Sequence, residues 1–130
     1  MTETATEIER ATQTLLGLQL WLVHYHKPKR FEDLKPHLQD HFAYAQSLER
    51  SGLLFAAGPI RTPEGEMEGR GLFVVRARDR AHAEQIAADD PMVQAGVRAF
   101  TVEHWTVNMG TLDVRLRYSD QSFALAGATQ

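Results

Sequence analysis

The stretch DHFAYAQSLERSGLLFAAGP, residues 40–59, carries the signals that decide the fold. Apolar residues on one face of an amphipathic helix recur every three or four positions, and here they are Leu34, Leu38, Phe42, Ala45 and Leu48. Gly52 suits the left-handed residue that closes such a helix. Residues 53–57 then form a short apolar run, and Gly58-Pro59 is typical of a turn. The stretch therefore predicts a helix, a short strand and a turn out of that strand.

The rest of the chain predicts three further strands and a second helix. We expect strands over 16–25, 71–77 and 99–107 and a second helix over 80–88. Asp33 is the predicted N-cap of the first helix, with Pro36 in its first turn, and residues 62–70 are the predicted mobile connection. The order is β-α-β-β-α-β, so the predicted fold class is α+β, a ferredoxin-like antiparallel sheet with both helices on one face.

Both faces of the first and third predicted strands are largely apolar. Trp21 and Val23 alternate with leucines in the first strand, and GLFVV, residues 71–75, is apolar almost throughout. A sheet with helices on one side only should leave its other face polar, so this pattern indicates burial on both sides. We expect Trp21, Val23 and residues 71–75 to help form an interface with a second subunit on the face without helices.

The two ends of the chain differ from the middle. Residues 1–13 are polar and predict a flexible lead-in or a frayed helical turn. Residues 14–110 are the predicted ferredoxin-like domain, and residues 111–130 a C-terminal extension. Within the extension, apolar residues alternate with charged ones in a period of two, at Leu112, Val114, Leu116 and Tyr118. This pattern predicts a half-buried strand, at the edge of the sheet or exchanged with the partner subunit.

Composition narrows the class of protein. A chain of 130 residues has the size of one domain. Its formal charge of -3 and pI near 6.0 argue against a nucleic-acid-binding face, which would be basic. The polar N-terminus does not resemble a secretory signal, and the longest apolar run is too short to cross a membrane. The chain has no cysteine, so thiolate chemistry is excluded, and we expect a cytoplasmic protein.

A second motif, DPMVQAGV at residues 90–97, places an acid before a proline, a small apolar run and a glycine. Together with residues 40–59 it resembles the YciI-like (YCII-related) family, over roughly residues 17–109. The resemblance implies a ferredoxin-like domain whose sheets meet face to face in a dimeric α+β barrel. It also implies a candidate site formed by His41 and Asp90.

His41 and Asp90 are the expected catalytic residues. A histidine is the natural proton carrier near neutral pH, and a carboxylate on one ring nitrogen would orient it and raise the basicity of the other. The residues by themselves allow a plainer interpretation, in which His41 is a half-buried structural histidine and Asp90 a turn acid. The family motif favours the catalytic interpretation.

Other residues are expected to support the site. Tyr44, Gly58, Pro59 and Gly96 are the predicted substrate-binding positions. Many relatives carry an arginine three residues before the histidine, where it would meet an anionic substrate. Here that position is Leu38, which argues against an anion-binding role unless Arg30 or Lys35 replaces it.

The histidines also allow a metal site. His24 and His26 share a face of a strand, and His37 and His41 share a face of a helix. Four imidazoles from these two elements would suit zinc. No HExxH motif occurs, and Gly65, Gly69 and Gly71 lack the following helix that a nucleotide motif needs, so we expect neither a metal nor another cofactor.

The sequence thus predicts a homodimer or higher oligomer that binds a small organic molecule, without nucleic-acid or membrane partners. The resemblance favours a cofactor-independent lyase, isomerase or dehydrochlorinase-like enzyme that uses a His–Asp acid/base dyad. The alternative is a non-catalytic ligand-binding or sensing module of the same fold. In a third interpretation the protein is structural, and its tail strand makes the functional contact.

Overall fold

The computed structural model describes residues 1–125, and the chain divides into two units. The larger unit, Leu18–Thr106, spans the ferredoxin-like domain. Its elements, in chain order, are β1 (Leu18–Tyr25), η1 (Phe31–His37), α2 (Leu38–Arg50), β2 (Leu54–Arg61), β3 (Met67–Val75), α3 (Arg80–Ala88), α4 (Pro91–Gln94) and β4 (Phe100–Val107).

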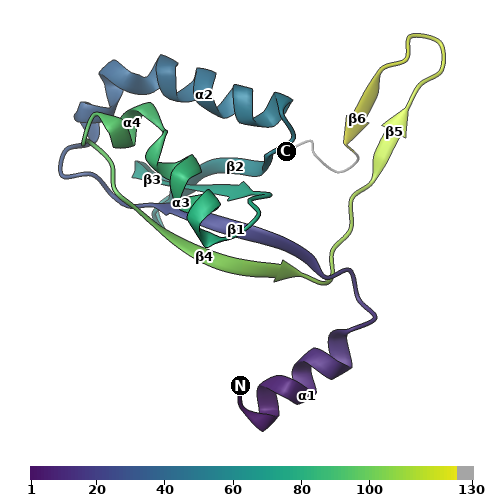
Figure 1. The fold of residues 1–130 in the computed structure, drawn as a ribbon. Coiled ribbons are helices and arrows are strands. Elements are labelled where there is room, and N and C mark those ends of the chain that lie inside the picture. The colour runs from purple at the N-terminus through teal and green to yellow at the C-terminus, as the bar shows by residue number, and fades with distance from the viewer. Residues whose placement is uncertain (126–130) are drawn as a thin grey trace. The chain divides into compact units, whose positions relative to one another are not determined.

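The larger unit is a sheet covered by helices. Its four strands lie in the order β2-β3-β1-β4, and β3 pairs antiparallel with both β1 and β2. The helices α2, α3 and α4 lie on the same face of this sheet (Figure 1). This arrangement confirms the predicted α+β fold with ferredoxin-like topology.

The core lies between the sheet and these helices. Alternate residues of β1 and β3 point into it, and Val23 pairs directly with Phe73 across the two strands. The buried cluster is Val23, Tyr25, Leu48, Phe73, Val75, Ala77, Ala83, Ile86 and Ala87, with Trp21 packed against it. Trp21 and Val23 therefore face the helices, and the prediction that they form a subunit interface is wrong. The opposite face carries the pairs Leu22–Val74 and His24–Leu72.

The first helical segment begins differently from the prediction. Residues 31–37 form the 3-10 helix η1 with Pro36 inside it, and α2 follows without a break. Asp33 lies within η1 and does not cap it, because η1 begins after Arg30, which makes no side-chain cap bond. At the other end, Gly52 follows α2 with φ of 82°, the left-handed conformation that the sequence predicted.

Strand β2 is longer than expected. Gly58 and Pro59 lie inside it, paired with Leu72 and Gly71, and do not form the predicted turn. Proline is tolerated there because β2 is an edge strand, where a missing N–H breaks no ladder. The predicted mobile connection is instead a tight hairpin, closed between Thr62 and Glu66 with Gly65 at φ of 86°.

The smaller unit combines residues 1–17 with residues from 107 onward. Its N-terminal part, predicted as a flexible lead-in or frayed turn, is the ten-residue helix α1 (Glu3–Thr12), capped by the Thr2 side chain, which accepts from the Ala5 N–H. Strand β5 (Val114–Leu116) pairs with β6 (Phe123–Leu125) in a separate two-stranded sheet.

This hairpin differs from the predicted edge strand. All residues of β5 and β6 are exposed, so the expected half-burial is not found, and β5 does not join the four-stranded sheet. Exchange of this strand with a partner stays a prediction. Residues 126–130, the end of the predicted extension, lie outside the described part of the chain. None of the helices described is long and apolar enough to cross a membrane.

Candidate functional site

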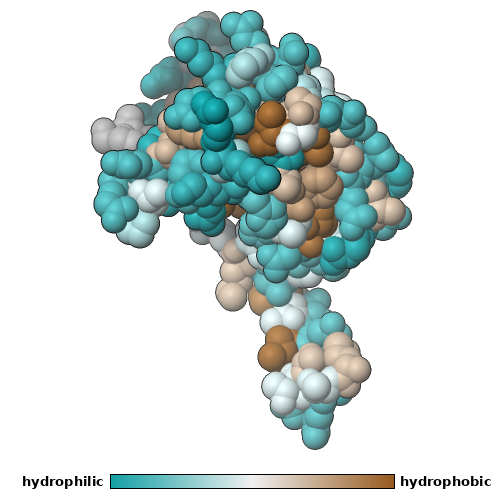
Figure 2. All heavy atoms as spheres, turned by 90° about the vertical axis from the view of Figure 1, so that its left-hand side faces the viewer, coloured by the Kyte–Doolittle hydropathy of each residue, from teal (hydrophilic) through white to brown (hydrophobic). Residues whose placement is uncertain are grey.

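A cavity of about 740 Å³ lies in the larger unit. Its walls come from η1 and α2 on one side and from β1, β2, β3 and the segment around α4 on the other. Most of the lining is apolar, and the charged residues among it are Glu32, Lys35, Arg70 and Arg98. One side of the molecule shows apolar residues gathered in a patch amid a largely hydrophilic surface (Figure 2). The cavity therefore suits a small molecule with an apolar body.

His41 lies on the cavity wall, one turn into α2. Its side chain is 10% exposed. The ring stacks on Phe73, with centroids 5.4 Å apart and planes inclined by 26°, and it also contacts Phe42 and forms a T-shaped contact with Tyr25. These aromatic contacts fix the plane of the imidazole, so that one ring edge faces the helices α3 and α4.

Asp90 lies between α3 and α4 and is fully buried. It precedes Pro91, which favours the extended backbone observed there, φ of -62° and ψ of 129°. As the N-cap of α4, it accepts a hydrogen bond on Oδ1 from the Met92 N–H at 2.8 Å. The short helix thus uses one carboxylate oxygen and holds the other toward α2.

The second oxygen of Asp90 joins His41 to Tyr25. Oδ2 lies 2.7 Å from Nδ1 of His41 and accepts from the Tyr25 hydroxyl at 2.9 Å. Burial acts to raise the pKa of Asp90, but the hydrogen bond and charge of His41, with the other donors, outweigh it and leave that pKa below its ordinary value. Burial, together with the charge of Asp90, raises the pKa of Tyr25.

This network defines the chemistry available to His41. Because the carboxylate is ionised, Nδ1–H donates to Asp90 and the remaining nitrogen, Nε2, is the basic one. Among residues 1–125, no hydrogen bond to Nε2 is found. The imidazole is therefore held by one nitrogen and free to exchange a proton at the other, the geometry of a general acid/base.

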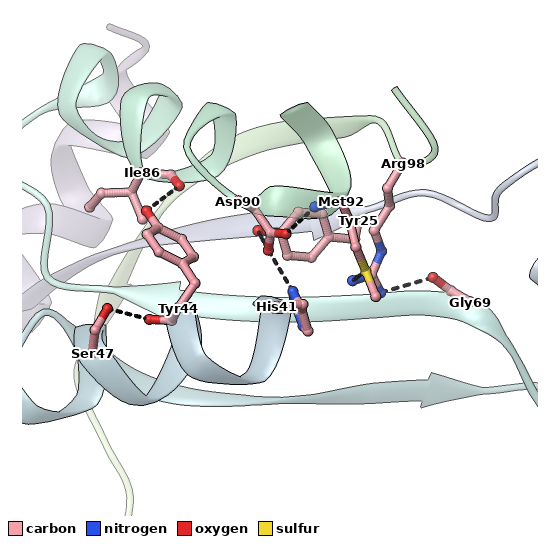
Figure 3. A network of polar contacts seen from close by, with 9 residues as sticks. All are labelled: Tyr25, His41, Tyr44, Ser47, Gly69, Ile86, Asp90, Met92 and Arg98. Carbon is pink, nitrogen blue, oxygen red and sulfur yellow. Dashed lines mark hydrogen bonds and ion pairs between the residues drawn. The ribbon is translucent and has the colours of Figure 1, made fainter. Parts of the chain in front are cut away.

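Arg98, two residues before β4, completes the polar side of the cavity. Its Nη2 donates to the Gly69 carbonyl at 2.9 Å, and Nη1 lies 3.6 Å from the Met92 sulfur. The guanidinium carbon lies 4.3 Å from the centroid of the Tyr25 ring. Figure 3 shows these side chains grouped around Tyr25 and Asp90.

Two of the four predicted substrate-binding residues line the cavity and two do not. Gly58 and Pro59 line the cavity from β2. Tyr44 is not part of the lining; its hydroxyl donates to the Ile86 carbonyl at 2.7 Å, and burial, with nearby Asp89 and Asp90, raises the pKa of Tyr44 to about 12. Gly96 is not part of it either, and with φ of 74° it ends α4 through a bond to Val93.

The position of the missing arginine also lies on the cavity. Leu38 forms part of the lining, as does Lys35, one of the two proposed replacements. The other, Arg30, is not in the lining, and its exposed side chain lies 3.8 Å from Asp33. Sequence reasoning missed Tyr25 and Arg98. For Tyr25 a signal existed, since strand alternation placed it on the same face as Val23; for Arg98 the sequence gives none.

The metal interpretation finds little support in the arrangement of the histidines. No group of three or more histidine, cysteine, aspartate or glutamate side chains in the described residues is placed to hold a metal ion. His24 lies beside Glu103, with Nε2 and Oε1 2.7 Å apart, and His41 is held by Asp90. The strand and helix faces that carry the four histidines do not form one site.

Comparisons with known proteins bear on the fold and the family. Among curated proteins, none matches the chain. The structure of a 5-chloro-2-hydroxyhydroquinone dehydrochlorinase from Burkholderia phenoliruptrix AC1100, in complex with 2,5-dihydroxybenzoquinone, is similar with a TM-score of 0.54. It is 23% identical, and the alignment covers 66% of this chain and 92% of that one, which shows a shared fold. The YCII-related domain matches residues 19–106, most of the chain, and the chain therefore belongs to the YCII-related family.

Proposed function

We propose that the protein is an enzyme that moves a proton on a small ring-shaped organic molecule without a cofactor, by elimination or isomerisation. His41 is the general acid/base and Asp90 positions it. The observation that carries this proposal is the 2.7 Å contact between His41 Nδ1 and a fully buried Asp90 carboxylate, at the wall of a cavity of about 740 Å³.

The proton transfer uses both nitrogens of His41. Nε2 removes a proton from a carbon or hydroxyl of the bound molecule, while Nδ1–H stays bonded to Asp90. The imidazolium that forms is stabilised by the ionised carboxylate next to it. In an elimination, the electron pair of the broken bond forms a double bond and expels the leaving group with its charge. In an isomerisation, the imidazolium returns the proton at another atom.

The size and surface of the cavity support a flat, largely apolar substrate. Phe31, Leu34, Leu38 and Phe42 line one side of the cavity and Pro59 the opposite β2 side, and none of these side chains can hydrogen-bond a ligand. The similar dehydrochlorinase is described with a dihydroxylated quinone. Hydroxylated and chlorinated aromatic compounds are therefore the first class of substrates to test.

The experiment incubates the purified protein with a panel of hydroxylated and chlorinated aromatics and ring lactones, and follows absorbance and chloride release. We expect turnover of at least one ring compound, lost in His41→Gln and kept in His26→Gln, a control histidine that is exposed and outside the cavity. Ligand binding without turnover by any compound would contradict the enzyme and favour a binding or sensing module.

We also propose that the protein is a homodimer, as the dimeric α+β barrel of its family implies. The sheet face without helices supports this, because it carries the partly exposed Leu22 and Leu72 beside the buried Val74. Light scattering coupled to size exclusion measures the mass in solution. A monomer at micromolar concentration would contradict the barrel.

A further inference from the structure

The Arg98 side chain is a cation in the cavity wall without a counter-ion. It is half-buried, and no carboxylate of residues 1–125 lies within ion-pair distance of its guanidinium. Its Nε is buried and finds no acceptor among the same residues. Of the five N–H groups of an arginine, one donates to the Gly69 carbonyl and one points at the weakly accepting Met92 sulfur. Donors therefore remain for a ligand.

An unpaired cation at this depth needs a physical explanation. Burial is unfavourable for a charged group and lowers the pKa of Arg98 from its ordinary value, although the charge of Asp90, which forms no ion pair with it, acts to raise that pKa and an arginine stays protonated at neutral pH. The Tyr25 ring face, 4.3 Å from the guanidinium carbon, offsets part of this cost by cation–π attraction. The ring supplies no negative charge, so the site remains complementary to an anion.

The rest of the cavity has the same polarity. Three basic residues, Lys35, Arg70 and Arg98, line it, against the single acid Glu32. Asp90 does not line the cavity, and both its oxygens are taken by donors from His41, Tyr25 and Met92. The charge of Asp90 is thus turned away from the cavity, and an anion there meets three basic side chains against the one acid, Glu32.

We propose that the substrates of this cavity are planar ring compounds with an ionised oxygen, and that Arg98 binds this oxygen while His41 exchanges the proton. The inference rests on the proposed function and names its substrate class. On the α2 side of the cavity, the residue one turn before His41 is Leu38, which offers only an apolar side chain. The anion anchor therefore lies across the cavity, at the loop before β4.

The geometry supports a division of roles between the two residues. Both contact the Tyr25 ring, His41 in a T-shaped arrangement and Arg98 with its guanidinium 4.3 Å from the ring centroid, so Tyr25 lies between the two residues (Figure 3). A ring that packs against the apolar side chains can place one oxygen at the guanidinium and a neighbouring C–H or O–H at Nε2. Arg98 then also stabilises the charge that builds on that oxygen when the proton leaves.

Binding of matched probes by calorimetry tests the inference. Benzoate and benzamide share a shape and differ in charge, as do nitrophenolate and nitroaniline, and the two pairs distinguish a carboxylate from a phenolate. We expect the wild-type protein to bind at least one anion about tenfold more tightly than its neutral partner. We expect Arg98→Gln to remove that preference while leaving the neutral probe unaffected.

Two further variants sharpen the test. A Cβ at Gly71 would lie 2.8 Å from Nη2 of Arg98, so Gly71→Ala displaces the guanidinium without removing its charge and should weaken the anion in the same way. Arg30→Gln is the control, since Arg30 lies outside the cavity lining and 3.8 Å from Asp33; it should change affinity less than about threefold.

The binding results show whether Arg98 binds an anionic oxygen. Anion selectivity that is lost in Arg98→Gln and kept in Arg30→Gln supports the inference. Equal binding of charged and neutral probes, or selectivity that survives in both Arg98→Gln and Gly71→Ala, overturns the inference and leaves the proposed function standing. If no probe of either charge binds and no ring compound is turned over, both fail.

Discussion

The cavity has a polar side and an apolar side, and the residues of each are held in place by different interactions. On the polar side, His41, Tyr25 and Arg98 surround the buried Asp90, and their hydrogen bonds and ring contacts depend on one another. On the apolar side, Phe31, Leu38 and Phe42 are 46%, 37% and 55% exposed, and only contact area holds them. Hydrogen bonds fix angles and distances, whereas apolar packing tolerates substitution. The polar side is therefore suited to chemistry and the apolar side to selecting the size of the ligand.

The largest expected effect comes from the polar side. His41→Gln keeps a polar side chain of similar length but removes the titratable nitrogen, so turnover should fall by about a hundredfold to ten-thousandfold. Ligand affinity should change little, because the apolar side and Arg98 are intact. Steady-state kinetics and calorimetry on the same preparation measure both. Equal losses of binding and turnover would show that His41 is part of the packing and no acid/base.

Asp90→Asn tests what positions His41. The variant keeps the shape but removes a buried charge that accepts three hydrogen bonds, so the free energy of unfolding should fall by about 2 kcal/mol at neutral pH, and turnover should fall with it. Denaturant titration measures the first. Asp89→Asn is the control, since the Asp89 side chain is exposed and, among residues 1–125, accepts only from Gln85 at 2.7 Å.

The difference in unfolding free energy between wild type and Asp90→Asn should shrink as the pH falls. The pKa of Asp90 is depressed in the folded protein, so its stabilising contribution is present above the unfolded value of about 3.9 and is lost as pH falls through the folded value. Wild type and Asp90→Asn should therefore converge below about pH 4. A gap that stays constant from pH 7 to the acid limit would mean that the charge of Asp90 contributes nothing.

A pair of tyrosines gives an intermediate effect. Tyr25→Phe removes the hydroxyl that donates to Asp90, and Tyr44→Phe the one that donates to the Ile86 carbonyl, so each should cost about 1 kcal/mol of unfolding free energy. Only Tyr25 lines the cavity, so only Tyr25→Phe should also slow turnover. If Tyr44→Phe slows turnover equally, Tyr44 belongs to the site and not only to the core.

The apolar side should give the smallest effect on stability. Leu38 is already 37% exposed, so Leu38→Ala should cost about 1 kcal/mol or less. Its expected consequence is a KM raised roughly threefold for small rings, with kcat unchanged and larger rings better accepted. A fall in kcat comparable to that of Asp90→Asn would remove the contrast between the two sides.

Periodicity in the sequence was enough to predict the order of the elements. Helix α3 has the predicted bounds, Arg80–Ala88, because its spacing and apolar face are local properties. Strand β2 was cut short at Gly58-Pro59, since a proline looks like a turn until its strand is known to lie at the sheet edge. The position of a strand within a sheet is a property of the whole fold, which no local window contains.

The candidate site was also predictable only in part, because its residues come from distant parts of the sequence. His41 and Asp90 lie 49 residues apart in sequence, and a family motif linked them where spacing could not. Tyr25 and Arg98 carry no motif, and their contact depends on how β1 and the loop before β4 meet. Tyr44 lies three residues after His41 on α2, yet its hydroxyl donates to the Ile86 carbonyl and it does not line the cavity, so its role in substrate binding stays a prediction.

The packing of Gly69 has a consequence for how this protein can vary. Its φ is 95°, and a Cβ there would lie 2.4 Å from Cδ of Pro28, while its carbonyl accepts from Arg98. In a library that randomises the cavity, position 69 should therefore retain glycine alone, whereas positions 38 and 42 should admit many residues. Sequence drift can then alter what the cavity accepts, one rim residue at a time, while the backbone that holds the arginine stays the same.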